Sequence, residues 1–167
     1  MDKRLPDCVR AMTSAAFYPH SVESLSMQET HISWVFLTGS FVYKVKKPVT
    51  LDFLDFGTLE KRRHYCRREV ELNRRLTSGV YLEVVPITRD GARFELAGAG
   101  QAVEYAVKMR QLADDVSLKQ LLPGNKIEPA TIESLARTLA RFYRKAASGP
   151  EIDRFGSWEI IRKNCLD

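Results

Sequence analysis

The sequence predicts an α+β fold, in which a small antiparallel sheet carries one long helix and an all-helical region follows. Three observations predict it. Short β-prone runs separated by turn residues occupy residues 22–47 and 84–109. A strongly charged helical pattern lies between them, at 59–77. From residue 117 onward the pattern is helical only, which places the helical region after the sheet rather than between its strands.

The composition is that of a globular protein with no membrane-spanning segment. Hydrophobic residues make up 44% of the 167 residues and charged residues 28%. No apolar run approaches the roughly 20 residues that a spanning helix needs, and no secretory signal is recognisable. Three widely separated cysteines predict reduced thiols and a cytoplasmic location. The net charge of +5 suits an anionic partner such as a nucleotide or a nucleic acid.

The individual elements follow from local signals. A short helix is expected first, and three strands then end at Pro48. Thr58 is expected to cap the long helix, and Asp90-Gly91 is a hairpin signal between two further strands. The expected helices are 5–16, 59–77, 129–147 and one from about 156; the expected strands are 22–27, 32–37, 41–47, 84–88, 93–96 and 103–109, with a connector at 49–57.

The long helix places a carboxylate on its apolar face. At 100° per residue, Tyr65, Cys66, Leu72 and Leu76 share one stripe, and Glu69 falls in the middle of it. A carboxylate that faces the sheet is costly to bury unless it meets a cation or strong hydrogen-bond donors. The helix therefore predicts a basic partner for Glu69 on the sheet.

The strand at 41–47 offers that partner. Alternation puts Val42, Lys44 and Lys46 on one face of this strand. Kinases use a strand lysine, held by a helix glutamate, to contact the phosphates of ATP. Lys44 is the preferred phosphate lysine because apolar Val42, two residues earlier, would then lie over the adenine ring, and Lys46 is the alternate. A purely architectural Lys–Glu pair remains the other interpretation.

Four runs resemble the N-terminal part of bacterial aminoglycoside-phosphotransferase-like proteins. They are 29–39 (ETHISWVFLTG), 41–49 (FVYKVKKPV), 53–63 (FLDFGTLEKRR) and 103–110 (VEYAVKMR). The resemblance covers residues 12–167. It implies a protein-kinase-like fold, with an N-terminal helical segment at 1–21, a nucleotide-binding N-lobe at 22–110 and the start of a truncated helical C-lobe at 111–167.

The resemblance also implies roles for particular residues. Lys44 matches the phosphate lysine and Glu69 the helix glutamate. The backbone of Met109, Arg110 and Gln111 matches the hinge that binds the adenine edge. The turn at 30–33 matches the nucleotide-positioning loop, where backbone amides and the hydroxyls of Thr30 and Ser33 would meet phosphate oxygens; an ordinary hairpin is the alternative there.

The same resemblance marks what is missing. The family's catalytic loop, His-Gly-Asp-x-His-x-x-Asn, does not occur, and no histidine lies beyond His64. Asp55-Phe56-Gly57 spells the magnesium motif of kinases but precedes the long helix, so it is interpreted as a decoy. The expectation is an inactive fragment of an enzyme that transfers the γ-phosphoryl group of ATP, with Mg²⁺, to a small-molecule acceptor. The rest of the C-lobe and a downstream P-loop domain would complete it.

Two other functions stay open at this point. Basic residues crowd the long helix and would suit nucleic-acid phosphates, although Glu60, Glu69 and Glu71 interrupt them; the basic residues are Lys61, Arg62, Arg63, Arg67, Arg68, Arg74 and Arg75. A catalytically inactive kinase-like scaffold is the second alternative, because the residues that decide activity are not in this sequence.

Overall fold

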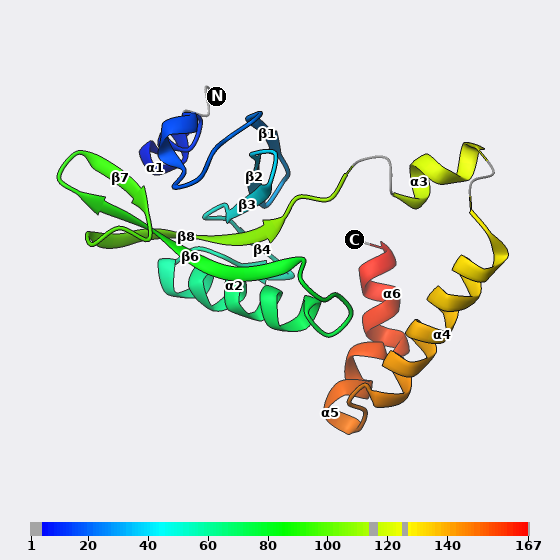
Figure 1. Cartoon of the computed structure of the whole chain (residues 1–167). Coiled ribbons are helices and arrows are strands. Elements are labelled where there is room, and N and C mark those ends of the chain that lie inside the picture. The colour runs from blue at the N-terminus through cyan, green and yellow to red at the C-terminus, as the bar shows by residue number, and fades with distance from the viewer. Residues whose placement is uncertain (1–4, 114–116, 125–126, 167) are drawn as a thin grey trace. The chain divides into compact units, whose positions relative to one another are not determined.

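The computed structural model describes residues 5–113, 117–124 and 127–166. The chain divides into two compact units, residues 1–113 and 114–167. The first unit contains every strand and the long helix, and the described part of the second contains helices only, which confirms the predicted α+β class. Figure 1 shows the strands and the long helix in the first unit and helices in the second.

A six-stranded antiparallel sheet is the frame of the first unit. Its strand order is β1-β2-β3-β8-β6-β7, so the last strand of the sheet in the sequence pairs directly with β3. The bounds are β1 Ser26–Glu29, β2 Ser33–Leu37, β3 Phe41–Lys46, β6 Tyr81–Asp90, β7 Arg93–Leu96 and β8 Gln101–Arg110. A separate small hairpin is formed by β4, Thr50–Leu51, and β5, Leu54–Asp55.

Local signals explain most of these elements. Gly91, at φ +57°, turns β6 into β7 at the predicted hairpin, and Gly39, at φ +91°, turns β2 into β3. Thr58 caps the long helix, α2 (Leu59–Asn73), because its side chain accepts a hydrogen bond from the Lys61 backbone amide at 3.2 Å.

Several element boundaries differ from those expected. The N-terminal helix is shorter, with α1 at Asp7–Ala11 and a 3₁₀ turn at Ala15–Phe17. The first strand lies further on, and α2 ends four residues earlier than expected. The connector at 49–57 contains the β4–β5 hairpin, in which Thr50 donates to Asp55.

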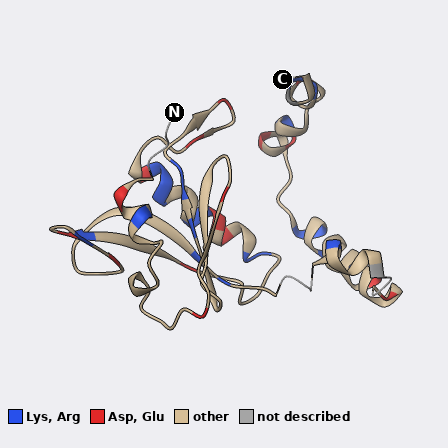
Figure 2. Cartoon of the chain, turned by 90° about the horizontal axis from the view of Figure 1, so that it is seen from above, with Lys and Arg blue, Asp and Glu red and all other residues tan. Residues whose placement is uncertain are grey.

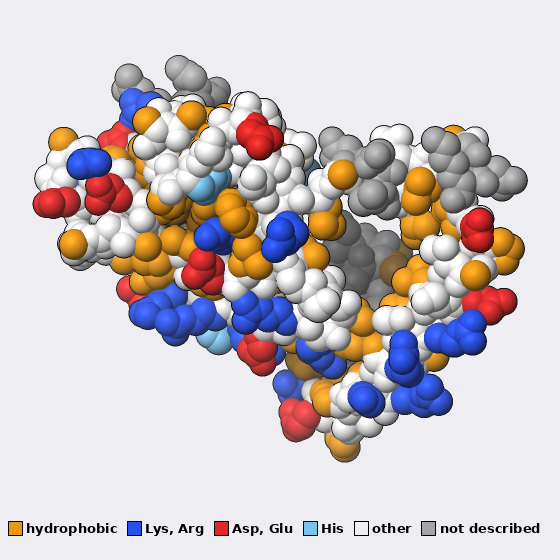
Figure 3. Space-filling model, in the orientation of Figure 1, with side chains coloured by type: hydrophobic (Ala, Val, Ile, Leu, Met, Phe, Trp, Pro, Cys, Tyr) orange, Lys and Arg blue, Asp and Glu red, His pale blue; other side chains and the backbone are white. Residues whose placement is uncertain are grey.

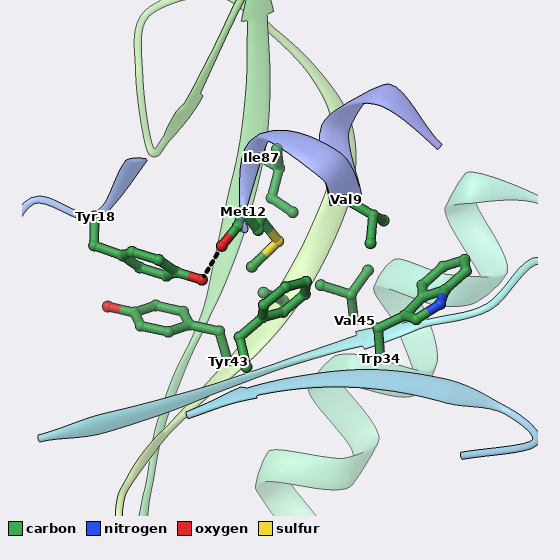
Figure 4. Close-up of a cluster of buried hydrophobic side chains, with 9 residues drawn as sticks. Val9, Met12, Tyr18, Trp34, Tyr43, Val45 and Ile87 are labelled. Atoms are coloured by element: carbon green, nitrogen blue, oxygen red, sulfur yellow. Dashed lines mark hydrogen bonds between the residues drawn. The ribbon is translucent and has the colours of Figure 1, made fainter. Parts of the chain in front are cut away.

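The two faces of the sheet are covered differently. On one face, α1 and the segment after it pack on the sheet and close the main core (Figure 4), which consists of Val9, Met12, Tyr18, Trp34, Phe36, Tyr43, Val45, Ile87 and Ala106. On the other face lies α2, whose Cys66 and Val70 pack on Val107. Residues alternate between these faces along each strand.

The described part of the second unit is made of helices. They are α3 Leu118–Leu121, α4 Pro129–Lys145, α5 Pro150–Asp153 and α6 Trp158–Leu166, with 3₁₀ turns at Leu122–Gly124 and Arg154–Gly156. α4 buries none of its residues, and its apolar Ile132, Leu135 and Leu139 are exposed. None of the described helices combines the length and the hydrophobicity that crossing a membrane requires.

Candidate functional site

The predicted contact between strand and helix is present. The Lys44 ammonium, on β3, donates to Glu69 Oε1, on α2, at 2.9 Å. The Glu69 side chain is 13% exposed and that of Lys44 28%, so the pair is largely buried and the lysine remains partly open to solvent. The structure therefore brings together the two residues on which the sequence-based site depends.

A second lysine shares the same carboxylate. Lys46 Nζ lies 2.6 Å from Glu69 Oε2, and its side chain is only 6% exposed. The Lys46 ammonium also lies 4.8 Å from the centre of the Phe56 ring, a cation–π distance. Two ammonium groups on one carboxylate leave a net charge of about +1 at neutral pH.

The charge state of Glu69 reflects this arrangement. Burial alone raises the pKa of the Glu69 carboxyl, but the Lys46 and Lys44 ammonium groups outweigh burial and hold that pKa below its ordinary value. Glu69 is therefore ionised at neutral pH. Lys44, Lys46 and Glu69 together carry a net positive charge, and the Lys44 side chain is partly exposed. This arrangement favours an anionic ligand at Lys44.

Packing and a side-chain hydrogen bond hold the backbone of α2 around Glu69. Cys66 is fully buried one turn before it, and the Asn73 side-chain amide donates to the Glu69 backbone carbonyl at 2.8 Å. The expected inward stripe is only partly correct, because Tyr65, Leu72 and Leu76 are 41–45% exposed. The residues that are buried are Arg62, Cys66 and Val70, and Glu69 lies beside this stripe rather than in its middle.

Arg62 is the first residue of this buried stripe, and helical periodicity does not predict its burial. Arg62 Nε donates to both carboxylate oxygens of Glu104, on β8, at 3.0 and 2.8 Å. Its Nη1 donates to the Phe56 carbonyl at 3.0 Å. Burial raises the pKa of Glu104 although Arg62 opposes that rise. The available sequence signal was Glu104, a glutamate within an apolar strand run. This signal predicts a buried partner but does not identify it as Arg62.

An incompletely covered apolar surface lies next to Lys44. Val42 is opposite Leu37 on β2 and Met109 on β8, and Lys44 is opposite Val35 and Val107. Directly opposite residues point to the same face, so these side chains share the α2 side of the sheet. Val107 is buried under α2, whereas Val35, Leu37, Val42 and Met109 are only half-buried. They form an apolar floor beside the partly exposed Lys44 side chain.

The predicted hinge is at the end of β8. Met109 contributes its side chain to the edge of the α2 cluster. The backbone amides of Arg110 and Gln111 donate to the carbonyls of Val80 and Ser40, at 2.8 and 3.1 Å, and the Gln111 side chain accepts from the Gly39 amide at 3.0 Å. The position adjoins the apolar floor, but these two amides already have partners within the fold.

The turn at 30–33 is closed by its own hydrogen bonds. The Thr30 amide and hydroxyl both donate to the Ser33 carbonyl, at 2.9 and 3.1 Å, and the Ser33 amide donates to the Thr30 hydroxyl at 3.0 Å. The Ser33 side chain is fully buried opposite Lys46, and its hydroxyl lacks a hydrogen-bond partner. A role in phosphate binding would require this turn to rearrange.

The carboxylate of the kinase-like tripeptide at 55–57 is engaged by neighbouring groups of the fold. Asp55 accepts hydrogen bonds from the Gly57 amide, the Thr50 hydroxyl and the Lys61 ammonium, which together lower its pKa. Phe56 is buried. Across the described residues, no three His, Cys, Asp or Glu side chains lie close enough together to hold a metal ion.

The basic residues of α2 are largely engaged within the protein. Figure 3 shows Lys and Arg side chains along the lower side of the first unit, over α2, and Figure 2 shows acidic positions among the basic ones. The engaged residues are Lys61 with Asp55, Arg62 with Glu104, Arg63 over the Tyr105 ring, Arg68 with Glu71, and Arg74 with the carbonyls of Tyr81 and Leu82. This weakens the case for a nucleic-acid interface.

Comparison with known proteins finds relatives in mycobacteria. The matches include uncharacterized protein Rv2004c and uncharacterized protein MT2060 of Mycobacterium tuberculosis, and uncharacterized protein Mb2027c of Mycobacterium bovis. Each is 33% identical over 132 residues, which are 79% of this chain and 25% of the relative. The match thus spans a quarter of the length of these homologous proteins. No family model and no solved structure matches the chain.

Proposed function

We propose that this chain is the ATP-binding N-lobe of a larger, aminoglycoside-phosphotransferase-like kinase. The observation that carries the proposal is the contact of Lys44 with Glu69 beside a half-open apolar surface. Kinases hold ATP with this combination, in which the lysine contacts phosphate and the glutamate orients the lysine. The apolar surface supplies the flat contact that an adenine ring needs.

Lys44, rather than Lys46, is the phosphate lysine in this proposal. The Lys44 side chain is more than four times as exposed as that of Lys46, so Lys44 is the more accessible of the two lysines to a phosphate. Val42, two residues earlier on the same face, lies where an adenine ring would rest. The adenine edge would meet the chain near Met109, at the end of β8.

The remaining parts of such an enzyme would come from other segments of the longer protein. The relatives extend well beyond the matched stretch, which leaves room for a C-lobe with the catalytic loop and for a further P-loop domain. Mg²⁺ would be held by carboxylates of those segments, because the described residues here bring no suitable group together. The acceptor would be a small molecule bound chiefly outside this chain.

Nuclear magnetic resonance titration tests this function directly, because it detects weak binding and maps it. MgADP added to the isotope-labelled chain should shift the signals of Val42, Lys44 and Met109 in a saturable manner. Inorganic triphosphate should perturb Lys44 but not Met109, since it lacks the adenine ring. Shifts that are absent, or that lie only on the α1 side of the sheet, would contradict the proposal.

A further inference from the structure

Lys46 is the most buried charged group of the Glu69 cluster, and the proposed ATP site does not use it. Its ammonium lies between Glu69 Oε2, at 2.6 Å, and the face of the Phe56 ring, at 4.8 Å. The Lys46 side chain is only 6% exposed. This burial makes it far less accessible to a triphosphate than Lys44, whose side chain is 28% exposed.

Phe56 is itself held firmly in place. Its amide donates to the Val49 carbonyl at 2.9 Å, and its carbonyl accepts from Arg62 Nη1 at 3.0 Å. Arg62 is fixed in turn by two hydrogen bonds to Glu104. A continuous set of contacts therefore leads from β8 through the start of α2 and Phe56 to Lys46, and so to Glu69.

The two oxygens of Glu69 are divided between the two lysines. Oε1 accepts from Lys44 and Oε2 from Lys46. If Lys44 turns toward a phosphate, the carboxylate keeps a buried cationic partner and retains its charge and orientation. Without Lys46, the same movement would leave a half-buried carboxylate with no cation, which is costly.

We propose that Lys46, covered by Phe56, is a positioning residue that holds Glu69 in place while Lys44 binds the ligand phosphate. This inference rests on the proposed ATP site, since it assigns Lys44 to the ligand. It predicts that the two lysines are not equivalent: Lys44 acts on the ligand, and Lys46 acts on Glu69.

The test compares Lys44→Met, Lys46→Met and Lys46→Arg with the parent chain. Lys108→Met is a matched control, because Lys108 is 22% exposed and pairs with Glu83 elsewhere on the sheet. Two quantities are measured: the titration of the Glu69 side-chain carboxyl by carbon-13 resonance, and MgADP affinity. Circular dichroism checks that each variant is folded.

Lys46→Met should raise the midpoint of the Glu69 titration more than Lys44→Met does, and Lys46→Arg should restore it largely. MgADP affinity should fall about 10- to 100-fold in Lys44→Met, the loss of one charge-assisted hydrogen bond, and by a smaller factor in Lys46→Met. A Glu69 midpoint that is unchanged in Lys46→Met, or that moves more in Lys44→Met, would overturn the inference. Failure of the parent chain to bind MgADP would reject the ATP site, and the Glu69 titration would still decide the positioning role.

Discussion

Arg62, on α2, and Glu104, on β8, form a buried ion pair in which Arg62 Nε donates to both carboxylate oxygens, at 3.0 and 2.8 Å. The pair ties the start of the long helix to the central strands and supports the Phe56 carbonyl. Removing one partner from such a pair leaves an uncompensated buried charge, whereas removing both leaves none.

We therefore expect strong non-additivity at this pair. Arg62→Met should lower the free energy of unfolding by about 3–5 kcal/mol, and Arg62→Met combined with Glu104→Met should recover a large part of that loss. Urea unfolding of the single and double variants measures the coupling. Simple addition of the two single losses would show that the pair does not act as a unit.

Glu69 should make the stability of the protein depend on acid pH. Its pKa lies below the ordinary value, so the ionised carboxylate stabilises the fold above the ordinary carboxyl pKa and loses that contribution as pH falls through the lowered pKa. The difference in unfolding free energy between the parent and Glu69→Gln should be largest near neutral pH and shrink on acidification. Glu71→Gln, on the same helix in an exposed pair with Arg68, is the control. A difference that stays constant between about pH 7 and pH 3 would contradict this account.

The three cysteines should differ in reactivity toward iodoacetamide. Cys66, on α2, is fully buried against the sheet, and burial raises its pKa to about 12, so its thiolate is scarce at neutral pH. Cys165 is exposed, and Cys8 is partly buried with a pKa that burial also raises. Peptide mass spectrometry over time should show Cys165 labelled first and Cys66 last. Early labelling of Cys66 would mean that α2 leaves the sheet readily.

The basic helix should not confer nucleic-acid binding. Arg62 is buried, and Lys61, Arg68 and Arg74 have partners within the protein. Fluorescence anisotropy with duplex and single-stranded oligonucleotides should therefore show little binding even at low salt, where phosphate contacts are strongest. Oligonucleotide binding whose affinity falls steeply as the salt concentration rises would support the nucleic-acid-binding alternative.

Local patterns predicted the class of fold and the central contact of the candidate site. Alternation along β3 placed Lys44 and Lys46 on the face that carries α2, and helical periodicity turned Glu69 toward it. Both inferences need only the geometry of a single element. Strand alternation did not distinguish Lys44 from Lys46 as the partner of Glu69. In the structure both lysines donate to Glu69, one to each carboxylate oxygen.

Specific side-chain contacts set what the periodic patterns could not predict. Tyr65, Leu72 and Leu76 of the expected apolar stripe are exposed, and α2 buries Arg62 instead, which pairs with Glu104, 42 residues away in the sequence. The β4–β5 hairpin depends on local contacts, in which the Asp55 carboxylate accepts hydrogen bonds from Thr50 before it and from Gly57 after it. Neither arrangement has a periodic signature in the sequence.

The proposed function depends on binding of a nucleotide phosphate by the Lys44 ammonium. Isothermal titration calorimetry with MgATP on the parent chain, Lys44→Met and Lys108→Met measures this binding. We expect the parent and Lys108→Met to bind equally, and Lys44→Met to bind about 10- to 100-fold more weakly. If the parent and a folded Lys44→Met bound MgATP with equal affinity, Lys44 would not be the phosphate lysine.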